Sequence, residues 1–465
     1  MSCVGNLAAF VCRSAYEDLS ETAREQLKIR VLDSIGCAVG AFEGEPVQII
    51  RQQVSEFESQ GKCTLVGGGS ASPDRAAFYN GALVRYLDFN DAYLAKGETC
   101  HPSDNLAAIL AGAEYAGRTG REVMTALAIA YQVQCRLSDV APVRDKGFDH
   151  TTQGSYSQAA GVSKILGLDE SKTANAIAIS GAAFNALRVT RTGHLSHWKG
   201  LAFPNTAACC TWVVFLASHG ITGPLEVFEG DKGFMDAIAG VFEIDWLRED
   251  LERVKRTILK RFNAEIHSQA AIQGVLDLKR RHQFCAADVT RIEIETFDVA
   301  FNIIGGGEEG NKTNSVATKE QADHSLPYVI AVAVLDGDVM PAQYELKRIR
   351  SEDVQNLLRR VSVSANSLYS QRFPEEMPCR IQVILRDGRT LVKESRDYPG
   401  FLSQPMSWDM ATSKFNLLTA PYTTDAERVA IAGAIADFEN TRISGLMQLL
   451  TSIRAPSAMG GLKHA

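Results

Sequence analysis

Residues 88–105, DFNDAYLAKGETCHPSDN, bring three aspartates, a glutamate, a lysine, a cysteine and a histidine into one short segment. We expect Asp88 and Asp91, three residues apart on one helix face, to point with His101 into a cleft in which protons move. The alternative is an ordinary polar loop between one helix and another that begins at Pro102, since proline suits the first helical turn.

Four cationic residues are candidates for holding a carboxylate. Lys199 in HWKGLAFPN and Lys260 in ILKRFNAEIH each stand beside aromatic residues, although an isolated lysine more often extends into water. Arg188 and Arg191 in NALRVTRTGH share a helix face or an adjoining turn. A guanidinium group matches a carboxylate through two parallel hydrogen bonds, so this pair suits an acidic substrate.

Two further residues could donate or accept a proton, and two motifs offer weaker chemistry. His150 in GFDHTTQG and Tyr328 in ADHSLPY are the proton-transfer candidates. GGGEEG at 305–310 fits Gly-x-Gly-x-x-Gly, but a polar segment follows it in place of a helix, so we expect a flexible loop. His194 and His197 have metal-ligand spacing without a third ligand at a recognisable distance, so we expect no metal.

The cysteines give no sign of a disulfide framework, a zinc knuckle or an iron–sulfur cluster. The ten of them are dispersed, and no Cys-x-x-Cys pair occurs. This distribution favours reduced thiols, and the adjacent Cys209 and Cys210 suit a buried helix. No Gly-x-Ser-x-Gly nucleophile elbow occurs either, which weakens a hydrolase interpretation.

The elements that must position these residues are mostly helices. TAREQLKIRVLDSIGCAVGAF predicts a helix with a capping box at Thr22 and Glu25, and TGREVMTALAIAYQVQCRL predicts one with a box at Thr119 and Glu122. Later segments rich in Ala and Gly predict buried helices packed closely in a bundle.

The pattern changes near Ala287. DVTRIEIETFDVAF alternates apolar and polar residues, and CRIQVILRDGRTLVKESR predicts two strands joined at Asp387 and Gly388. SLPYVIAVAVLDG predicts a buried helix between them. We therefore predict a mainly α protein in which a helical domain, residues 1–267 and 405–465, contains an inserted α+β lid domain, residues 268–404.

The composition limits location and partners. The 465 residues exceed what one core usually supports, and 48 basic against 55 acidic side chains leave no basic tract for nucleic acid. No apolar run approaches the roughly 20 residues that span a bilayer, and the first residues lack the pattern of a secretory signal. We expect a cytoplasmic protein that binds neither nucleic acid nor membrane.

Five segments taken in order carry a resemblance to a known family. They are DFNDAYLAKGETCHPSDN, GFDHTTQGSYSQAAGVSKILGL, SHWKG, LKRFNAEIHSQAA and ADHSLPY. Together they resemble the successive motifs of the MmgE/PrpD family from about Leu19 to Leu418. The resemblance implies a helical domain, a lid domain, a homodimer and a site that works without a metal or organic cofactor.

The resemblance also implies the site residues. It assigns Asp88, His101, His150, Lys199, Lys260 and Tyr328 to the active site of a lyase that acts on a small di- or tricarboxylic acid. The DFND and HPSDN segments are especially similar to the dehydratase branch, so we expect dehydration of 2-methylcitrate or a related hydroxy acid. Ala92 stands where the family pattern commonly has threonine.

Dehydration of a β-hydroxy acid needs a base for the C–H beside a carboxylate, an acid for the departing hydroxyl, and cations for the developing charge. We expect Lys199, Lys260 and Arg188, with Arg191 and Asp91, to hold the substrate, and His101, oriented by Asp88, to move a proton. Tyr328 would be a second proton carrier.

Three alternatives follow from the same residues. Crowding of ammonium groups could lower the pKa of Lys260 and make it the base. The same groups could serve a decarboxylase of the cis-aconitate type or an epimerase, because each reaction passes through a carbanion beside a carboxylate. A relative that binds an organic acid without turnover is the remaining possibility, with Ala92 as its sign.

Overall fold

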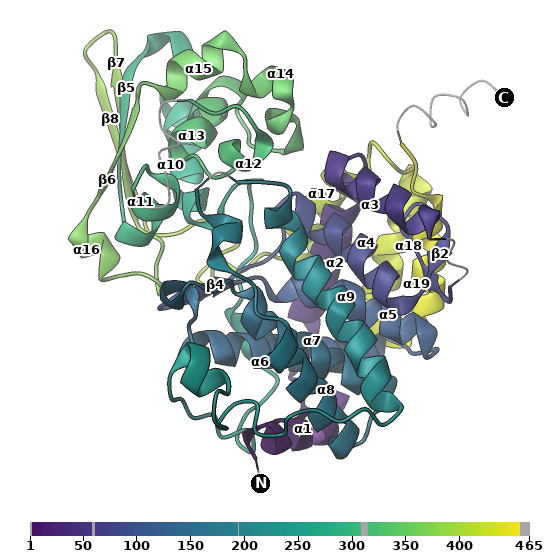
Figure 1. Ribbon diagram of the computed structural model, residues 1–465. Helices are drawn as coiled ribbons and strands as arrows, with labels where there is room; N and C mark the ends of the chain where they lie inside the picture. The colour runs from purple at the N-terminus through teal and green to yellow at the C-terminus, as the bar shows by residue number, and fades with distance from the viewer. Residues whose placement is uncertain (1, 58–60, 194, 308–314, 456–465) are drawn as a thin grey trace, which may run out of the picture. The chain divides into compact units, whose positions relative to one another are not determined.

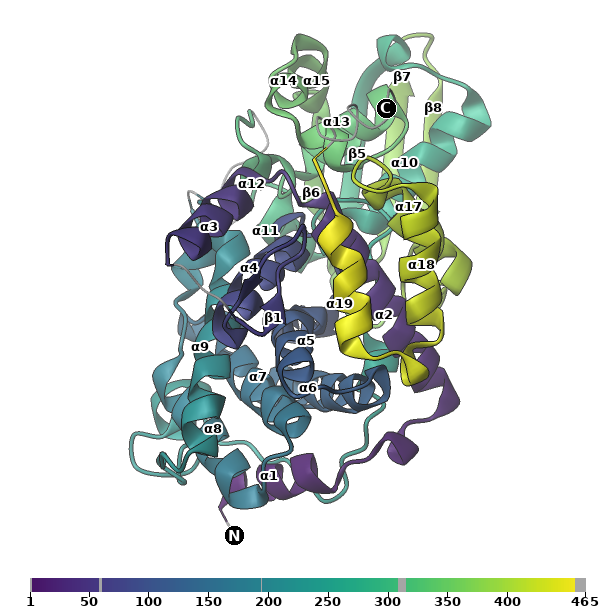
Figure 2. The same ribbon diagram turned by 90° about the vertical axis from the view of Figure 1, so that its right-hand side faces the viewer.

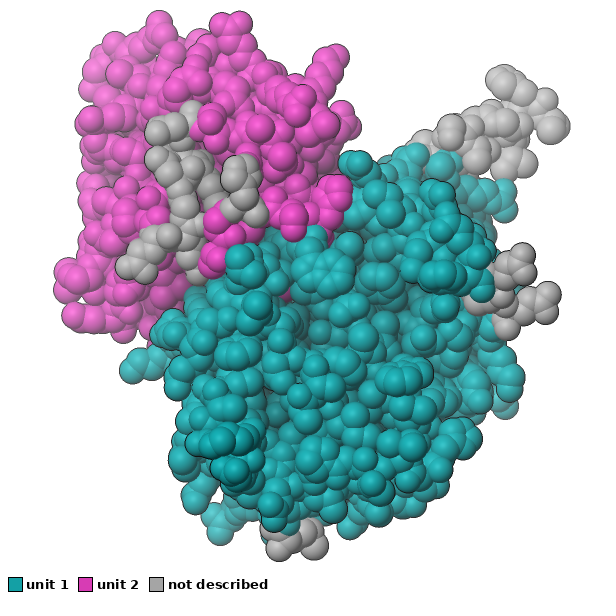
Figure 3. All heavy atoms as spheres, viewed as in Figure 1, with its two compact units in different colours: residues 1–190, 198–257, 406–465 teal, residues 191–197, 258–405 magenta. Residues whose placement is uncertain are grey.

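The computed structural model describes residues 2–57, 61–193, 195–307 and 315–455. The chain forms two compact units (Figure 3). Unit 1 comprises residues 1–190, 198–257 and 406–465, and unit 2 comprises residues 191–197 and 258–405. The sequence places the change of domain at residue 268 and the return at residue 405.

Unit 1 is built almost entirely of helices, which confirms the prediction of a mainly α protein (Figure 1). Its helices are α1 (Cys3–Arg13), α2 (Glu21–Gly40), α3 (Glu45–Glu56), α4 (Pro73–Tyr86), α5 (Leu106–Tyr115), α6 (Gly120–Val140), α7 (Thr151–Leu166), α8 (Glu170–Ala183), α9 (Trp198–Ser218), α17 (Trp408–Thr419), α18 (Asp425–Ala436) and α19 (Ile443–Leu449). Two short hairpins join them, β1 (Cys63–Thr64) with β2 (Ser70–Ala71) and β3 (Tyr93–Ala95) with β4 (Glu98–Cys100).

Helix α7 is the central element of unit 1, with α5, α6, α8 and α9 packed against it (Figure 2). Small residues allow this close approach, because a side chain at Gly154 would collide with Phe203, and one at Gly161 with Ile109. The Ala- and Gly-rich pattern of these segments therefore corresponds to a closely packed bundle.

The predicted capping boxes have different outcomes. In α6, the Glu122 carboxylate accepts hydrogen bonds from both the backbone N–H and the hydroxyl of Thr119, as predicted. The box predicted at Thr22 and Glu25 is wrong, because α2 begins earlier, at Glu21, and its N-cap is Ser20, whose hydroxyl accepts from the Ala23 N–H at 3.2 Å. Two candidates for the cap, Ser20 and Thr22, lie two residues apart and made the start ambiguous.

The C-terminal segment returns to unit 1, as the sequence indicates. Helix α17 packs along α2. Its buried Lys414 forms an ion pair with the Asp33 carboxylate of α2 at 2.7 Å. A residue more than three hundred positions downstream is thereby part of the core of the helical body.

Unit 2 contains a four-stranded sheet of order β6-β5-β7-β8. Its strands are β5 (Val289–Thr296), β6 (Val361–Ala365), β7 (Cys379–Leu385) and β8 (Thr390–Ser395). The predicted strands and the hairpin at Asp387 and Gly388 are present, whereas β6, which is parallel to β5, was not predicted. Its five residues are mostly exposed, so they lack the alternation that marks a half-buried strand.

Helices accompany this sheet. They are α10 (Gln269–His282), α11 (Asp298–Ile304), α12 (Lys319–Ala322), α13 (Leu326–Asp336), α14 (Leu346–Ile349), α15 (Glu352–Leu358) and α16 (Ser367–Ser370). Helix α13, predicted as buried, contacts both α10 and β6 (Figure 1). Its first nine residues, Leu326 to Val334, are all buried.

One helix among the described residues, α9, is long and apolar enough to cross a membrane by length and composition. From the sequence we expected no uninterrupted apolar run of that length. The most apolar window of α9 is 61 % buried inside the protein, as is common for a core helix.

Candidate active site

The segment that follows α4 is a loop and a hairpin, not the helix face that the sequence suggested. Helix α4 ends at Tyr86, so Asp88 and Asp91 lie beyond it. Asp88 has a φ of +53°, in the left-handed region that non-glycine residues seldom occupy. Such a conformation persists only where the surroundings hold it, and it is more common at functional sites than elsewhere.

Asp91 fixes the position of the residues around His101. Its carboxylate accepts hydrogen bonds from the Ser103 N–H at 3.1 Å, the Ser103 hydroxyl at 2.6 Å and the Tyr131 hydroxyl at 2.7 Å. Burial raises the pKa of Asp91 above its usual value, and these hydrogen bonds oppose the rise. Asp91 is therefore a positioning residue inside the protein.

The backbone of Asp91 determines the tautomer of His101. The imidazole Nδ1 lies 2.6 Å from the Asp91 carbonyl oxygen. A carbonyl oxygen can only accept, so Nδ1 carries the hydrogen and Nε2 is the nitrogen that can take up a proton. His101 is 7 % exposed, so its imidazole sits in largely buried surroundings.

A second imidazole faces the first. The ring centroids of His101 and His150 are 5.4 Å apart in an edge-to-face arrangement. His150 Nδ1 lies 3.2 Å from the Asp149 carboxylate, and Asp149 also accepts from the Thr151 N–H at the start of α7. The structure thus places the rings of His101 and His150 face to edge, whereas the family resemblance assigned both to the active site without indicating that they meet.

Arg85 is the centre of a buried network that the sequence analysis did not assign. From the last turn of α4, its guanidinium donates to the Asp88 carboxylate and lies 3.4 Å from that of Asp104. Asn90 donates to Asp104 at 2.7 Å and accepts from Arg85 at 3.5 Å. Burial opposes the charge of Arg85, but Asp88 and then Asp104 raise its pKa overall.

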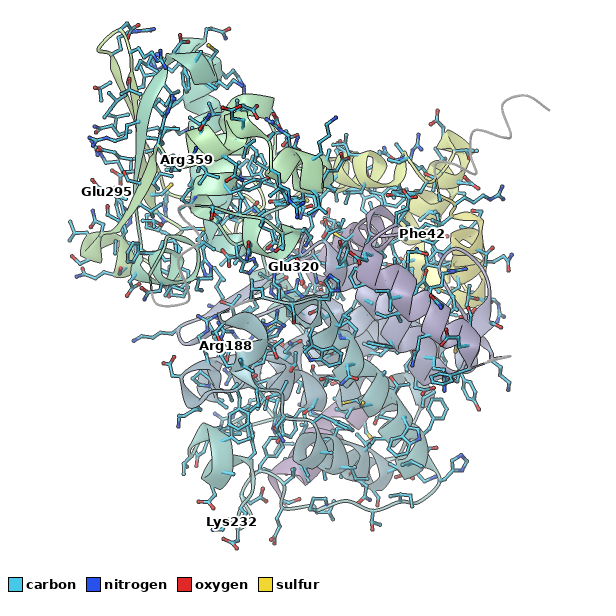
Figure 4. All side chains as sticks on the ribbon, turned by 45° about the horizontal axis from the view of Figure 1, so that its top comes forward. Phe42, Arg188, Lys232, Glu295, Glu320 and Arg359 are labelled. Carbon is cyan, nitrogen blue, oxygen red and sulfur yellow. The ribbon has the colours of Figure 1, made fainter. Side chains whose placement is uncertain are left out.

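Lys199 and Arg188 also face carboxylates. The Lys199 ammonium, in the first turn of α9, donates to Asp88 at 3.0 Å and is 4 % exposed. An Arg188 nitrogen lies 4.0 Å from the Asp149 carboxylate. Arg188 begins the short 3-10 helix Arg188–Arg191 and is labelled in Figure 4. Because Asp88 already contacts the cations of Arg85 and Lys199, its carboxylate is better placed to hold Lys199 than to bind a metal.

Backbone contacts place these groups. The Asp149 N–H donates to the Ala186 carbonyl at 2.8 Å, and the Arg188 N–H donates to the Gly147 carbonyl at 2.9 Å, so the residues before α7 pair with those before Arg188. The Lys414 ammonium donates to the carbonyl of Phe89, the residue between Asp88 and Asn90, at 2.7 Å.

The remaining predicted residues belong to unit 2 and are described within it. Tyr328 is completely buried near the start of α13, and its hydroxyl donates to the Gln343 carbonyl. Burial raises the pKa of Tyr328, which favours a structural role for this hydroxyl. Lys260 is 1 % exposed, and Arg191 ends the 3-10 helix Arg188–Arg191.

Unit 2 holds a buried carboxylate–imidazole pair near Lys260. Glu265 accepts from both the N–H and the Nδ1 of His267, each at 2.7 Å. Burial works against the charge of Glu265, but His267, then His324 and Lys260, lower its pKa to about 2. Glu265 is thus an anion that stabilises the start of the short helix Ile266–Ser268.

The weaker motifs contribute little. His194 and residues 308–310 of GGGEEG lie outside the described residues. His197 is exposed, and Cys210 is buried while Cys209 is half-buried on α9. Burial raises the pKa of both thiols, so neither is a reactive thiolate at neutral pH.

The site residues that sequence reasoning missed share one property: each is a polar residue buried in unit 1. They are Arg85, Asn90, Ser103, Asp104, Tyr131 and Asp149. The HPSDN motif contained two of them, and the spacing of Arg85 three residues before Asp88 was the available signal for a third.

Imidazoles, carboxylates and cations buried together in a helical unit are typical of enzymes that transfer protons. Family models identify the particular family: the MmgE/PrpD N-terminal domain matches residues 5–247 and the MmgE/PrpD C-terminal domain matches residues 262–437. The chain belongs to the MmgE/PrpD family.

Named relatives share about a quarter of their residues with this chain. It is 25 % identical to 2-methylcitrate dehydratase of Escherichia coli K12, with 83 % of each chain covered. It is 26 % identical to a fungal alkylcitrate dehydratase over 95 % of this chain and 92 % of the relative. The probable 2-methylcitrate dehydratase of Saccharomyces cerevisiae is 25 % identical, with 82 % and 78 % covered.

Proposed function

We propose that this protein is a hydro-lyase that dehydrates 2-methylcitrate or a related hydroxy tricarboxylic acid, using side chains alone. The observation that supports this proposal is that two imidazoles face each other, with ring centroids 5.4 Å apart. His101 can take up a proton on Nε2, and His150 contacts the Asp149 carboxylate. The relatives named above are dehydratases of 2-methylcitrate or alkylcitrate.

In the proposed reaction, His101 Nε2 takes the proton from the carbon beside a carboxylate. The electron pair of the broken C–H bond forms the carbon–carbon double bond as the hydroxyl leaves. His150, with Asp149 stabilising its protonated form, donates the proton with which the hydroxyl leaves as water. Lys199 and Arg188 hold the substrate carboxylates and stabilise the enolate-like charge.

Asp88 and Asp91 act through other groups in this scheme. Asp88 holds the Lys199 ammonium, and Asp91 holds the loop and the tautomer of His101. The roles of Lys260 and Tyr328 in unit 2 stay predictions from the family resemblance, and that of Arg191 stays a prediction from its spacing to Arg188. Of these, Tyr328 has the least support, because its hydroxyl is hydrogen bonded inside its own unit.

A panel of acids tests the proposal. The full chain is incubated with 2-methylcitrate, citrate and cis-aconitate while alkene absorbance, carbon dioxide release and solvent deuterium uptake are followed. We expect alkene formation from 2-methylcitrate or a close homologue. Carbon dioxide release would instead identify a decarboxylase, and deuterium uptake without an alkene an epimerase. Binding with none of these signals would identify a non-catalytic relative and contradict the proposal.

We further propose that the protein is a cytoplasmic homodimer. The dimer rests on the family resemblance, and the location rests on the burial of most of the apolar window of α9 inside unit 1. Sedimentation of the purified chain and fractionation of the source cells test these two statements.

A further inference from the structure

A cavity of about 520 Å³ lies in unit 1, at the opposite end of α7 from His150. Its lining comes from the end of α1, the start of α6 and the end of α7, and its charged residues are Arg13, Glu17, Arg118, Arg121, Glu122 and Lys164. Helix α7 has 16 residues, so about 24 Å of helix separates this cavity from the imidazoles.

The lining carries a surplus of positive charge on a chain whose net charge is −7. Arg13, Arg118, Arg121 and Lys164 face only two lining carboxylates, Glu17 and Glu122. Arg121 pairs with Glu17, and Arg118 pairs with Glu122 at 2.9 Å.

The other two cations have no such partner. Among the residues that the structure describes, Arg13 and Lys164 form no ion pair, and backbone carbonyls hold them instead. Lys164 donates to the Cys12 carbonyl at 2.9 Å, and Arg13 donates to that of Trp246 at 2.6 Å.

These anchors leave donors for a ligand. Two of these cations cap helix ends, since Lys164 donates to the Cys12 carbonyl at the end of α1 and Arg118 donates to the Ile165 carbonyl at the end of α7. Beyond those, Lys164 keeps two N–H groups and Arg118 keeps its second terminal nitrogen without an acceptor in the described part of the chain. Asp18 favours the Lys164 charge but forms no ion pair with it and accepts from the Ala15 N–H, and Glu249 pairs with Arg136. Burial lowers the pKa of Lys164, as expected for an ammonium short of a counter-charge.

We propose that this cavity is a binding site for a small polyanion with two or more carboxylate or phosphate charges, separate from the site around His101. Its volume lies within the range of small-molecule sites. Cations on three different helices surround the space, and rigid carbonyl anchors hold two of them, so little reorganisation is needed on binding. The inference does not depend on the proposed function.

Calorimetric titration of the full chain with pyrophosphate and with citrate tests the site and separates its two possible ligand chemistries. Lys164→Gln should weaken binding by about tenfold or more, since it removes a charge-assisted hydrogen bond. Arg121→Gln, at an exposed position that folding tolerates, should weaken it severalfold. The matched control is Lys172→Gln on the exposed face of α8, which should change binding less than twofold.

Lys199→Gln distinguishes this cavity from the proposed active site, because pyrophosphate binding should persist in a variant that lacks a cation proposed to hold the substrate there. Two outcomes would overturn the inference. One is that neither anion binds at up to about 10 mM, far above a useful affinity. The other is that Lys164→Gln and Arg121→Gln both bind as tightly as the Lys172→Gln control.

Discussion

His101 shows how a single contact can restrict the chemistry of a residue. The family resemblance assigned it to the site, but nothing in the sequence indicates which ring nitrogen carries hydrogen. The Asp91 carbonyl decides this, because it can only accept. The backbone of Asp91 therefore orients this ring nitrogen, and the orienting role expected of Asp88 stays a prediction.

At Asp88, two substitutions test separately the effect of the carboxylate charge and that of the left-handed backbone conformation. Asp88→Asn tolerates the left-handed conformation but loses the charge, and Asp88→Gly relieves the conformation and removes the side chain. Because the Lys199 ammonium then loses its carboxylate, we expect kcat/KM to fall about tenfold to a hundredfold in both variants. Steady-state kinetics with the substrate that the panel identifies measures this.

A result in which Asp88→Gly retains normal kcat/KM would mean that the carboxylate does not place Lys199 for catalysis. Circular dichroism of both variants controls for loss of fold.

Individual site residues could be predicted from the sequence only where they lie in a segment that resembles a family motif. His101, His150, Asp88 and Lys199 belong to recognisable segments, and the structure brings them into one buried region of unit 1. Arg85 was not found, because its partners come from the following loop and from η2 (Pro102–Asn105), which sequence spacing alone does not bring together.

At the scale of elements, helix starts depend on which of several polar residues acts as the cap. Glu122 accepts two hydrogen bonds from Thr119 at the start of α6, whereas Thr22 lies exposed inside the first turn of α2. We expect Thr119→Ala to cost about 1 kcal/mol of local stability and Thr22→Ala less than about 0.5 kcal/mol. Hydrogen exchange of the amides in the first turns of α6 and α2 measures both. Equal effects would show that the Thr119 contact adds no stability.

Glu265 at the start of the helix Ile266–Ser268 gives unit 2 a pH-dependent stability. Its folded-state pKa of about 2 lies below the ordinary 4.5, so its contribution is complete above pH 4.5 and is lost as the pH falls towards 2. From that difference, Glu265→Gln should lower the free energy of unfolding by up to about 3 kcal/mol at pH 6.

Denaturant unfolding of the wild-type protein and of Glu265→Gln between pH 6 and pH 2 tests whether their free energies of unfolding differ less as the pH falls. The two curves should converge as the pH approaches 2. A difference that stays constant with pH would contradict an ionised Glu265 in the folded state.

At the scale of the whole molecule, periodicity was sufficient for the mainly α class and for most of the sheet in unit 2. It predicted the hairpin β7–β8 and the buried helix α13, since Asp387 and Gly388 are strong turn residues and α13 is apolar on all sides. It did not predict β6 or the hairpin β3–β4, because short strands of mixed burial carry little periodic signal.

The proposed reaction supplies every charge from side chains, so metal removal tests it at the level of the whole enzyme. We expect turnover after exhaustive dialysis against a chelator to remain within about twofold of the untreated rate, because a catalytic metal would contribute several kcal/mol to the transition state. Loss of turnover that an added divalent cation restores would contradict a mechanism without metal.

The central claim is that His101 carries the proton in a dehydration reaction. The most direct test is kcat of His101→Ala beside the wild-type protein, with His219→Ala at an exposed position of the same unit as the control. We expect kcat to fall about a hundredfold or more in His101→Ala and to stay near normal in His219→Ala. Near-normal turnover of a folded His101→Ala variant would contradict it.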